Sequence, residues 1–332
     1  MSNNLFKPEI KFIIDVLKIL NKNKISVGTF AENLKYADMY QGKTILIKCS
    51  GGALEDTKKR AGIIQDILYL QAIGMKIVFV HGGKTIIGEY IQKAIQTNPN
   101  KKISNHKING LRATDMSNIH IIANALDALN KMLVLEIKKA AYGTDAKPIG
   151  ISGTKIFSAE QETQESLIGR QPIANHALVK DALNKGKIVI ISPLGSSLKN
   201  PKVTLNNNAD DAAVALCAAL KPDKVLFLSD VNGVLDKKGN TIPTLSIKEI
   251  EGLIENGTIT EGMRVKMEAL ASLIKSKHVD SISVGNGNTP HAILNELLTA
   301  KGDTGSTKIA YEKVLKTDMH ILNTIQALTN EK

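Results

Sequence analysis

Short apolar runs alternate with amphipathic helical patterns along most of this 332-residue chain, and this alternation restricts the fold more than any other feature. A strand, a helix and a second strand in succession form a crossover that makes the two strands parallel neighbours in one sheet. The sequence therefore predicts an α/β fold with a mostly parallel central sheet sandwiched by helices. The expected strands are Thr44–Ile47, Lys76–Val80, Lys147–Ser152, Lys187–Ser192, Lys224–Ser229 and Ser281–Val284. The expected helices are Asp56–Ala72, Thr85–Gln96, Asp115–Ala141, Asn175–Lys185, Ala209–Leu220, Ser246–Glu255, Gly262–Ser276 and Pro290–Ala300.

Segments outside this pattern divide the chain into an extension and two lobes. Residues 1–42 are predicted to be an N-terminal helical extension, because apolar residues recur at helical spacing over Ile10–Leu20. The polar stretch Asn200–Asn208, with three successive asparagines, is typical of a connection. We therefore expect one lobe over residues 43–199 and a second over residues 200–332.

Two lysines beside glycine-bearing turns are the strongest chemical signal. Lys48 follows the first predicted strand and precedes Gly51-Gly52, while His81-Gly82-Gly83 follows the second strand. Lys266 lies far along the chain, four residues after Gly262. Glycines let backbone N–H groups approach phosphate oxygens, and a following helix N-terminus adds positive potential. The pattern favours polyphosphate binding, although no Gly-x-x-x-x-Gly-Lys-Ser/Thr motif occurs at the first strand.

Composition excludes several other classes. The formal charge of +11 suggests nucleic acid, but the basic residues are spread along the chain, and aromatic residues make up only 4% with no Trp. The two cysteines, Cys49 and Cys217, imply neither a disulfide framework nor a thiolate metal site. No apolar run is long enough to cross a bilayer and the N-terminus lacks a signal-peptide pattern. We expect a cytoplasmic protein with no nucleic-acid or membrane partner.

An ordered set of motifs is more specific than any single turn. The set is Lys48-Cys-Ser-Gly-Gly52, His81-Gly-Gly83, Gly110-Leu-Arg-Ala-Thr-Asp115, Ile191-Ser-Pro-Leu-Gly195, Asn206-Asn-Asn-Ala-Asp210, Leu228-Ser-Asp-Val-Asn-Gly-Val-Leu-Asp236 and Gly262-Met-Arg-Val-Lys266. In this order and spacing the chain resembles the amino acid kinase family, over about Gly42 to Gly305. The resemblance implies transfer of the ATP γ-phosphoryl group to the side-chain carboxylate of N-acetyl-L-glutamate, in arginine biosynthesis. It also implies that residues 43–199 bind the acceptor and residues 200–332 the nucleotide.

The same resemblance assigns roles by position. Lys48 and Lys266 would offset charge on the transferring phosphoryl group, with Asp210 holding both lysines in place. No general base is needed, since a carboxylate acceptor is already ionised at neutral pH. Magnesium should be held mainly by the nucleotide phosphates and water, without a protein metal site. The remaining assignments are Gly82, Gly83, Arg112 and Asn206 for the substrate, and Gly51, Gly52, Ser229, Asp230, Gly262 and Met263 for nucleotide and phosphate, with N–H groups of Gly51, Gly82 and Gly83 cradling phosphoryl oxygens.

Three residues depart from the family pattern and leave alternatives open. Ser50 precedes Gly51 where a glycine is usual, Lys84 replaces the last glycine of His-Gly-Gly-Gly, and Lys155 follows Ser152-Gly153-Thr154 where an acidic residue is frequent. Both lysines would lie on the substrate side, so an unusually acidic acyl group is conceivable. The alternatives are another activity of this family on a related small acid, or a catalytically weak regulatory paralogue.

The N-terminal extension resembles that of the arginine-inhibited, hexameric members of the family. The segment Leu34–Thr44 is similar to the one that joins their extra helix to the first strand. This resemblance implies a homo-oligomer, a hexamer in those members, and L-arginine as an inhibitor bound near the extension. Lys224, Glu296 and Gly302 are the candidate regulatory residues.

Overall fold

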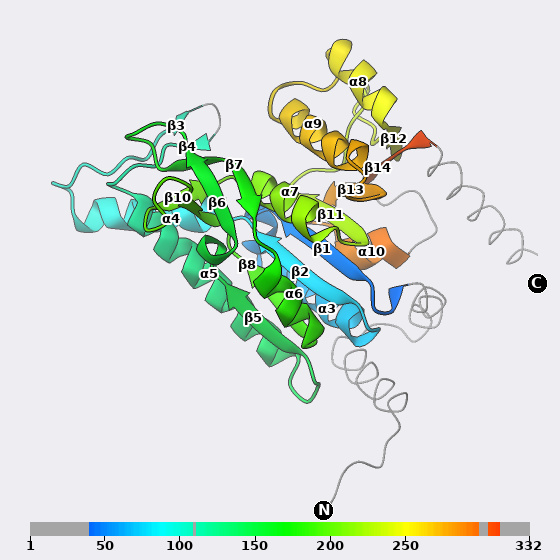
Figure 1. Cartoon of the computed structure of the whole chain (residues 1–332), viewed down its shortest axis with the longest axis horizontal. Helices are drawn as coiled ribbons and strands as arrows, with labels where there is room; N and C mark the ends of the chain where they lie inside the picture. Colours follow the sequence, from blue (N-terminus) through cyan, green and yellow to red (C-terminus); the bar gives the residue numbers. More distant parts are fainter. Residues whose placement is uncertain (1–39, 109–110, 299–304, 313–332) are drawn as a thin grey trace, which may run out of the picture.

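The computed structural model describes residues 40–108, 111–298 and 305–312, and its centre is one eight-stranded sheet (Figure 1). All six predicted strands belong to this sheet, and its neighbouring strands run parallel except where β13 meets β14. The predicted α/β fold with a mostly parallel sheet is therefore confirmed. In spatial order the strands are β12 (Thr244–Ser246), β14 (Thr307–Ala310), β13 (Ser281–Asn286), β11 (Lys224–Ser229), β1 (Thr44–Cys49), β2 (Lys76–His81), β8 (Lys187–Ile191) and β5 (Lys147–Ile151).

Helices cover both faces of the sheet (Figure 1). On one face pack α3 (Thr57–Ala72), α5 (Ile119–Ala140) and α10 (Ala292–Leu298). On the other face lie α6 (Ala177–Asn184), α7 (Ala209–Leu220), α8 (Ile247–Glu255) and α9 (Glu261–Lys275). The helix α4 (Lys84–Thr97) packs on α5 through a smaller apolar cluster. Each predicted helix between residues 56 and 300 is present, within a few residues at its ends.

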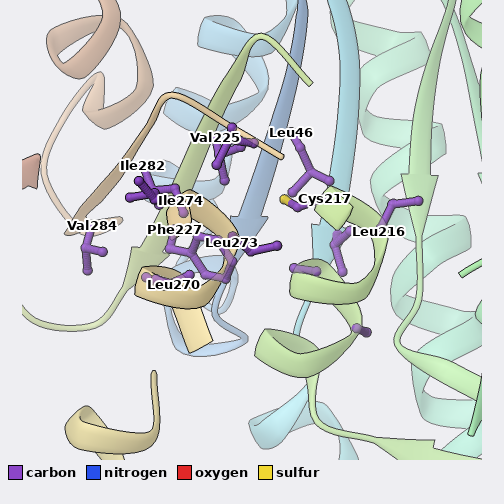
Figure 2. Close-up of a cluster of buried hydrophobic side chains, with 14 of the residues drawn as sticks. Leu46, Leu216, Cys217, Val225, Phe227, Leu270, Leu273, Ile274, Ile282 and Val284 are labelled. Atoms are coloured by element: carbon purple, nitrogen blue, oxygen red, sulfur yellow. The ribbon is translucent and has the colours of Figure 1, made fainter. Parts of the chain in front are cut away.

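Strand β1 shows how side-chain alternation positions a charged group. Successive side chains of a strand point to opposite faces, so Ile45 and Ile47 join the cluster beneath α3 while Leu46 joins the opposite one. Figure 2 shows Leu46 among side chains of α7, α9, β11 and β13. Full burial of one such side chain contributes roughly 1.5–3 kcal/mol. Lys48 has the parity of Leu46 and therefore lies on the α7 side of the sheet.

A four-stranded closed barrel lies beside the main sheet and was not predicted. Its strands are β10, β7, β6 and β9 in spatial order, so the predicted connection Asn200–Asn208 is in large part strand β10. A short hairpin of β3 and β4 completes the strands of the described residues. The bounds are β3 (Lys107–Ile108), β4 (Leu111–Arg112), β6 (Phe157–Gln161), β7 (Ile168–Ala174), β9 (Leu194–Ser197) and β10 (Thr204–Asn207), with 3₁₀ turns η1 (Gly52–Leu54) and η2 (Gly153–Lys155).

The central sheet crosses the predicted lobe boundary. Strand β1 of the first lobe pairs with β11 of the second over five residue pairs, from Ile45 opposite Lys224 to Cys49 opposite Leu228. The division into lobes remains a prediction, and any movement between them has to deform a hydrogen-bonded ladder. In the described part of the chain, no helix combines the length and apolar character needed to span a membrane.

Candidate active site

Lys48, Asp210 and Lys266 form a chain of two ion pairs, named here the ion triad. The Nζ of Lys48 lies 2.6 Å from one carboxylate oxygen of Asp210, and the Nζ of Lys266 lies 3.3 Å from the other. The lysine side chains are only 7% and 15% exposed. The structure thus brings together two lysines that are more than two hundred residues apart in the sequence, with the predicted aspartate between them.

Local structure explains why the triad assembles. Lys48 is near the carboxyl end of β1, Asp210 lies in the first turn of α7, and Lys266 lies in the second turn of α9. Asn208 caps α7, because its side-chain oxygen accepts a hydrogen bond from Asp210 N at 2.8 Å. The helix N-terminus also favours a negative charge at Asp210. Sequence reasoning missed Asn208, although an asparagine two residues before an acidic residue is a recognisable cap.

The charge state of Asp210 follows from two opposing effects. Burial disfavours the carboxylate, but the adjacent charges of Lys48 and Lys266 outweigh burial and hold the pKa of Asp210 below its usual value. The neighbouring Asp211 responds in the opposite way, since burial and the charge of Asp210 raise its pKa. Asp210 is therefore ionised throughout the physiological range and can hold two ammonium groups at one point.

The two glycine turns touch each other. A Cβ built on Gly51 would lie 2.8 Å from Lys84 N and 3.2 Å from Gly83 Cα, so only glycine permits this approach. No acceptor for the N–H groups of Gly51, Gly52 and Gly83 is found among the described residues. Gly82 differs from the prediction, because its N–H donates to Cys49 O at 2.8 Å and is not free for a phosphoryl oxygen. Its role is close packing, since a Cβ there would lie 2.9 Å from Gly51 N.

Asp230 lies against the first glycine turn. A Cβ on Gly52 would lie 2.7 Å from an Asp230 carboxylate oxygen, and the Ser50 hydroxyl donates to that carboxylate. The Ser229 hydroxyl instead donates to Val231 O at 3.1 Å. The unusual Ser50 thus joins the glycine turn to the turn that follows β11. Of the other predicted nucleotide residues, Gly262 lies in the first turn of α9 and Met263 packs against the core beneath it.

Arg112 and Asn206 are joined through Thr114. The Asn206 side-chain amide donates to the Thr114 hydroxyl at 3.0 Å, which donates to Arg112 O at 3.0 Å. The guanidinium of Arg112 is half-buried and donates to Asn105 Oδ1 at 3.0 Å. It forms no ion pair with Asp115, whose carboxylate accepts from Ser104 and Ser117. Burial lowers the pKa of Arg112, though a guanidinium stays charged.

An open groove of about 800 Å³ runs along α4 from Lys84 to Gln96, with Arg112 on its other side. We call it the α4 groove. Its lining includes three cationic side chains, of Lys84, Lys93 and Arg112, and one acidic side chain, of Glu89. Lys84 and Lys155 are both exposed, so neither unusual lysine is engaged in the core.

The candidate regulatory residues lie apart from the triad. A cavity of about 490 Å³ at the amino edge of the sheet, the amino-edge cavity, is lined by Tyr40, Lys221, Lys224 and Lys277 among others, with the Lys224 ammonium 5.7 Å from the Tyr40 ring centre. Glu296 instead accepts a hydrogen bond from the Ser306 hydroxyl. Gly302 and residues 1–39 lie outside the described residues, as does Gly110.

A helix-sandwiched, mostly parallel sheet that presents two lysines on one carboxylate beside two contacting glycine turns defines a phosphotransferase site. The sequence profile of the amino acid kinase family matches residues 43–286. The chain belongs to the amino acid kinase family, and this membership implies the use of ATP. Cys49, beside Lys48, is completely buried, and burial raises the pKa of its thiol to about 12, so the thiol stays protonated at neutral pH.

Individual relatives agree with the family assignment. The chain is 34% identical over 274 residues to an acetylglutamate kinase of Campylobacter hominis, covering 81% of this chain and 92% of the relative. It is 31% identical over 319 residues to an acetylglutamate kinase of a Marinomonas species, covering 91% and 97% of the two chains. These two relatives are matched over almost their entire length.

Solved structures support the fold. An N-acetylglutamate synthase of Neisseria gonorrhoeae, solved with coenzyme A and N-acetyl-glutamate, superposes with a TM-score of 0.69 at 23% identity over 86% of this chain. The chain spans 63% of that synthase, less than two thirds of its length. A carbamate kinase of Giardia lamblia bound to AMP-PNP superposes with a TM-score of 0.58 at 15% identity, over 82% of this chain and 99% of that one.

Proposed function

We propose that this protein is a cytoplasmic ATP-dependent kinase that phosphorylates the side-chain carboxylate of N-acetyl-L-glutamate, giving N-acetylglutamyl 5-phosphate and ADP in arginine biosynthesis. The observation that carries the proposal is the ion triad beside the two glycine turns. Phosphoryl transfer needs positioning and positive charge more than covalent chemistry, and the triad supplies both. The acetylglutamate kinases that match at 31–34% identity support the choice of acceptor.

Each group of site residues has its own role in this proposal. Lys48 and Lys266, held by Asp210, offset negative charge that moves between donor and acceptor. The N–H groups of Gly51 and Gly83 bind phosphoryl oxygens. Arg112 binds the acceptor α-carboxylate through its planar guanidinium, and Asn206, tied to it through Thr114, binds the acylated amino group. Asp230, Ser229, Gly262 and Met263 bind the nucleotide.

Magnesium fits this site as a companion of the nucleotide. The described residues contain no group of three or more His, Cys, Asp or Glu side chains that could form a protein cage for a metal. Mg²⁺ keeps several waters and is commonly bound through substrate phosphates, so the nucleotide phosphates and water would supply its shell. When bound, Mg²⁺ neutralises charge on the phosphates. Arg112 and Asn206 orient the acceptor.

A substrate panel tests the proposal. ADP release is measured with N-acetyl-L-glutamate, L-glutamate, L-aspartate and uridine monophosphate, and we expect turnover only with the acetylated amino acid. Because Lys84 is exposed in the α4 groove, the panel includes an N-acyl-L-glutamate whose acyl chain ends in a carboxylate. Lys266→Ala should lower kcat by about 10²–10³-fold and leave nucleotide binding measurable, as expected for loss of one preorganised charge. No ADP release above background with the N-acetylated acceptor would contradict the proposal.

Two finer expectations remain proposals about assembly and regulation. We propose a homo-oligomer, a hexamer, that L-arginine inhibits through the junction of the N-terminal extension with the second lobe. A structural relative, the Neisseria gonorrhoeae synthase, has been solved with L-arginine, and Lys224 lies at the amino-edge cavity beside Tyr40, where the extension joins. Deleting residues 1–39 should reduce the assembly size in sedimentation and the arginine sensitivity together. An unchanged assembly after deletion would refute this link.

A further inference from the structure

His81 ends β2 immediately before the second glycine turn and is completely buried. Its ring lies between two partners, with Nδ1 3.2 Å from Gly82 O and Nε2 3.2 Å from the side-chain nitrogen of Asn130 in α5. Burial lowers the pKa of His81 to about 4, and the bond to Gly82 opposes this effect only in part. The imidazole is therefore neutral at physiological pH and carries one N–H.

The neighbours of the ring decide which nitrogen carries that proton. The Asn130 nitrogen that faces His81 also lies 3.2 Å from Ile190 O, which can only accept a hydrogen bond. The atom is thus the NH₂ group, and it donates to both partners. His81 Nε2 must be the acceptor, so Nδ1 carries the proton and donates to Gly82 O.

Asn130 cannot easily turn away. Its side-chain oxygen packs against Gly150 of β5, where an added Cβ would lie 2.0 Å from that oxygen. The amide is therefore clamped between β5 and β8 while it contacts the end of β2. The tautomer of His81 is fixed by packing around the carboxyl ends of three neighbouring strands.

The hydrogen bond to Gly82 O sets the direction of the next N–H. The Gly82–Gly83 peptide is trans, so its C=O and its N–H point to opposite sides of the peptide. Holding the carbonyl toward His81 turns the Gly83 N–H away from the ring. This N–H has no acceptor among the described residues, and Gly83 adjoins Gly51 in the contact between the glycine turns.

We propose that His81 is a positioning residue that acts as a neutral, Nδ1-protonated imidazole and aims the Gly83 N–H at the transferred phosphoryl group. It touches no reacting atom and acts through the Gly82–Gly83 peptide. The proposal rests on the proposed function for the identity of the ligand, whereas the tautomer and the peptide orientation do not depend on it.

A matched pair of variants separates the two hydrogen bonds of His81. In His81→Asn the amide nitrogen can take the position of Nδ1 and still donate to Gly82 O. In His81→Gln the side-chain oxygen can take the position of Nε2 and accept from Asn130, but the donor to Gly82 is lost. We expect His81→Asn to keep kcat within about threefold and His81→Gln to lower kcat about 10- to 100-fold, with the KM for the acceptor nearly unchanged. Equal losses in both variants, or full activity in His81→Gln, would overturn the proposal.

A second measurement needs no activity. Nitrogen-15 NMR of the histidine-labelled full chain reports which imidazole nitrogen is protonated, and His81 is identified by the signal that either variant lacks. We expect an Nδ1-protonated ring that does not titrate between pH 5.5 and 8. An Nε2-protonated or titrating ring would overturn the proposal even if the enzyme is active. If no acceptor is phosphorylated but the tautomer is as expected, the proposed function fails and the assigned geometry of the turn stands.

Discussion

The ion triad and the α4 groove differ in how far their charges are removed from water. In the triad, Lys48 is buried and Lys266 is largely removed from water, and both contact the carboxylate of Asp210, whose backbone N–H is held by a helix cap. In the groove, Lys84 is exposed, and Arg112 is half-buried and donates to two neutral acceptors, Asn105 Oδ1 and Lys84 O. Charges in a low-dielectric, preorganised site act strongly and cost no reorganisation, whereas exposed charges are screened.

The two regions are therefore expected to control different properties of the enzyme, the type of reaction and the choice of acceptor. We expect the triad to set the type of reaction, because its geometry exists before any ligand binds. We expect the groove to set the acceptor, because its cations are not paired with a carboxylate of the described residues and can bind one from a ligand. The following predictions test that division, from the largest expected effect to the smallest.

Removing the negative charge from the triad should have the largest effect. Asp210→Asn keeps the shape of the side chain but leaves two buried ammonium groups facing each other. We expect kcat to fall by about 10²–10³-fold with the acceptor KM within a few-fold of wild type. Asp211→Asn, at the next residue of α7, is the matched control and should cost less than about tenfold. Equal losses in the two variants would show that the effect does not depend on the contact of Asp210 with the two lysines.

A substitution in the α4 groove should change the binding of the acceptor more than the turnover number. Arg112→Lys keeps the charge but loses the planar two-pronged donor, so the acceptor KM should rise about 10- to 100-fold while kcat changes little. Steady-state kinetics at saturating ATP measure both constants. Arg170→Lys is the control, since Arg170 pairs with Glu162 at the barrel surface and should behave as wild type. A fall in kcat with unchanged KM would place Arg112 with the triad.

The barrel strand that leads into α7 can be tested for stability. Asn207 is 4% exposed, and neither polar atom of its side chain has a hydrogen-bond partner among the residues that the structure describes. A Cβ on Gly169 would lie 1.9 Å from its oxygen. Gly169→Ala should therefore lower the free energy of unfolding by roughly 1–3 kcal/mol. The double variant with Asn207→Ala should recover most of the loss, as chemical denaturation can measure.

A matched glycine in open space provides the control for this pair. Gly252 lies inside α8 with nothing within 4 Å of an added Cβ, so Gly252→Ala should be neutral or stabilising by up to about 1 kcal/mol. If Gly169→Ala also leaves the free energy of unfolding unchanged, the close contact with Asn207 does not constrain the residue at position 169.

The smallest expected effect is the pH dependence of stability that comes from His291, the residue before α10. His291 Nδ1 lies 2.7 Å from buried Asp66, and this hydrogen bond raises the pKa of His291 against partial burial. A raised pKa gives stability that is fully present below the unfolded value near 6.5 and is lost as pH rises through the folded value. The Tm difference between wild type and His291→Gln should therefore be largest near pH 6 and shrink toward pH 9. The corresponding contribution to the free energy of unfolding should stay below about 1 kcal/mol, because half-exposed charges are screened. A difference that grows with pH would contradict this assignment.

The sequence predicted the main sheet because its strands are apolar, regularly spaced and separated by strongly periodic helices. It also predicted that Lys48 and Lys266 would meet at Asp210, which the structure shows; their catalytic roles remain proposals. The barrel escaped prediction because strands such as Leu194–Ser197 are short and rich in glycine and serine, which gives no clear two-residue period.

Parts of the site depend on contacts that no local pattern encodes. The link from Asn206 through Thr114 to Arg112 joins residues that are 92 or more positions apart, because β10 lies beside the segment after β4. The predicted phosphate role of the Gly82 N–H was wrong for a similar reason, since strand β1 supplies its acceptor, Cys49 O. Likewise, the exposure of Lys84 could not be predicted from the sequence, because it depends on how α4 packs.

The two helices that carry Asp210 and Lys266 also extend to the amino edge of the sheet. α7 ends at Leu220 and is followed by Lys221, while α9 ends at Lys275, two residues before Lys277. Lys221 and Lys277 line the amino-edge cavity, so helices of about 18 and 22 Å connect this cavity to the ion triad. A ligand bound in this cavity would therefore contact the chain at the far ends of the two helices whose first two turns hold Asp210 and Lys266 together.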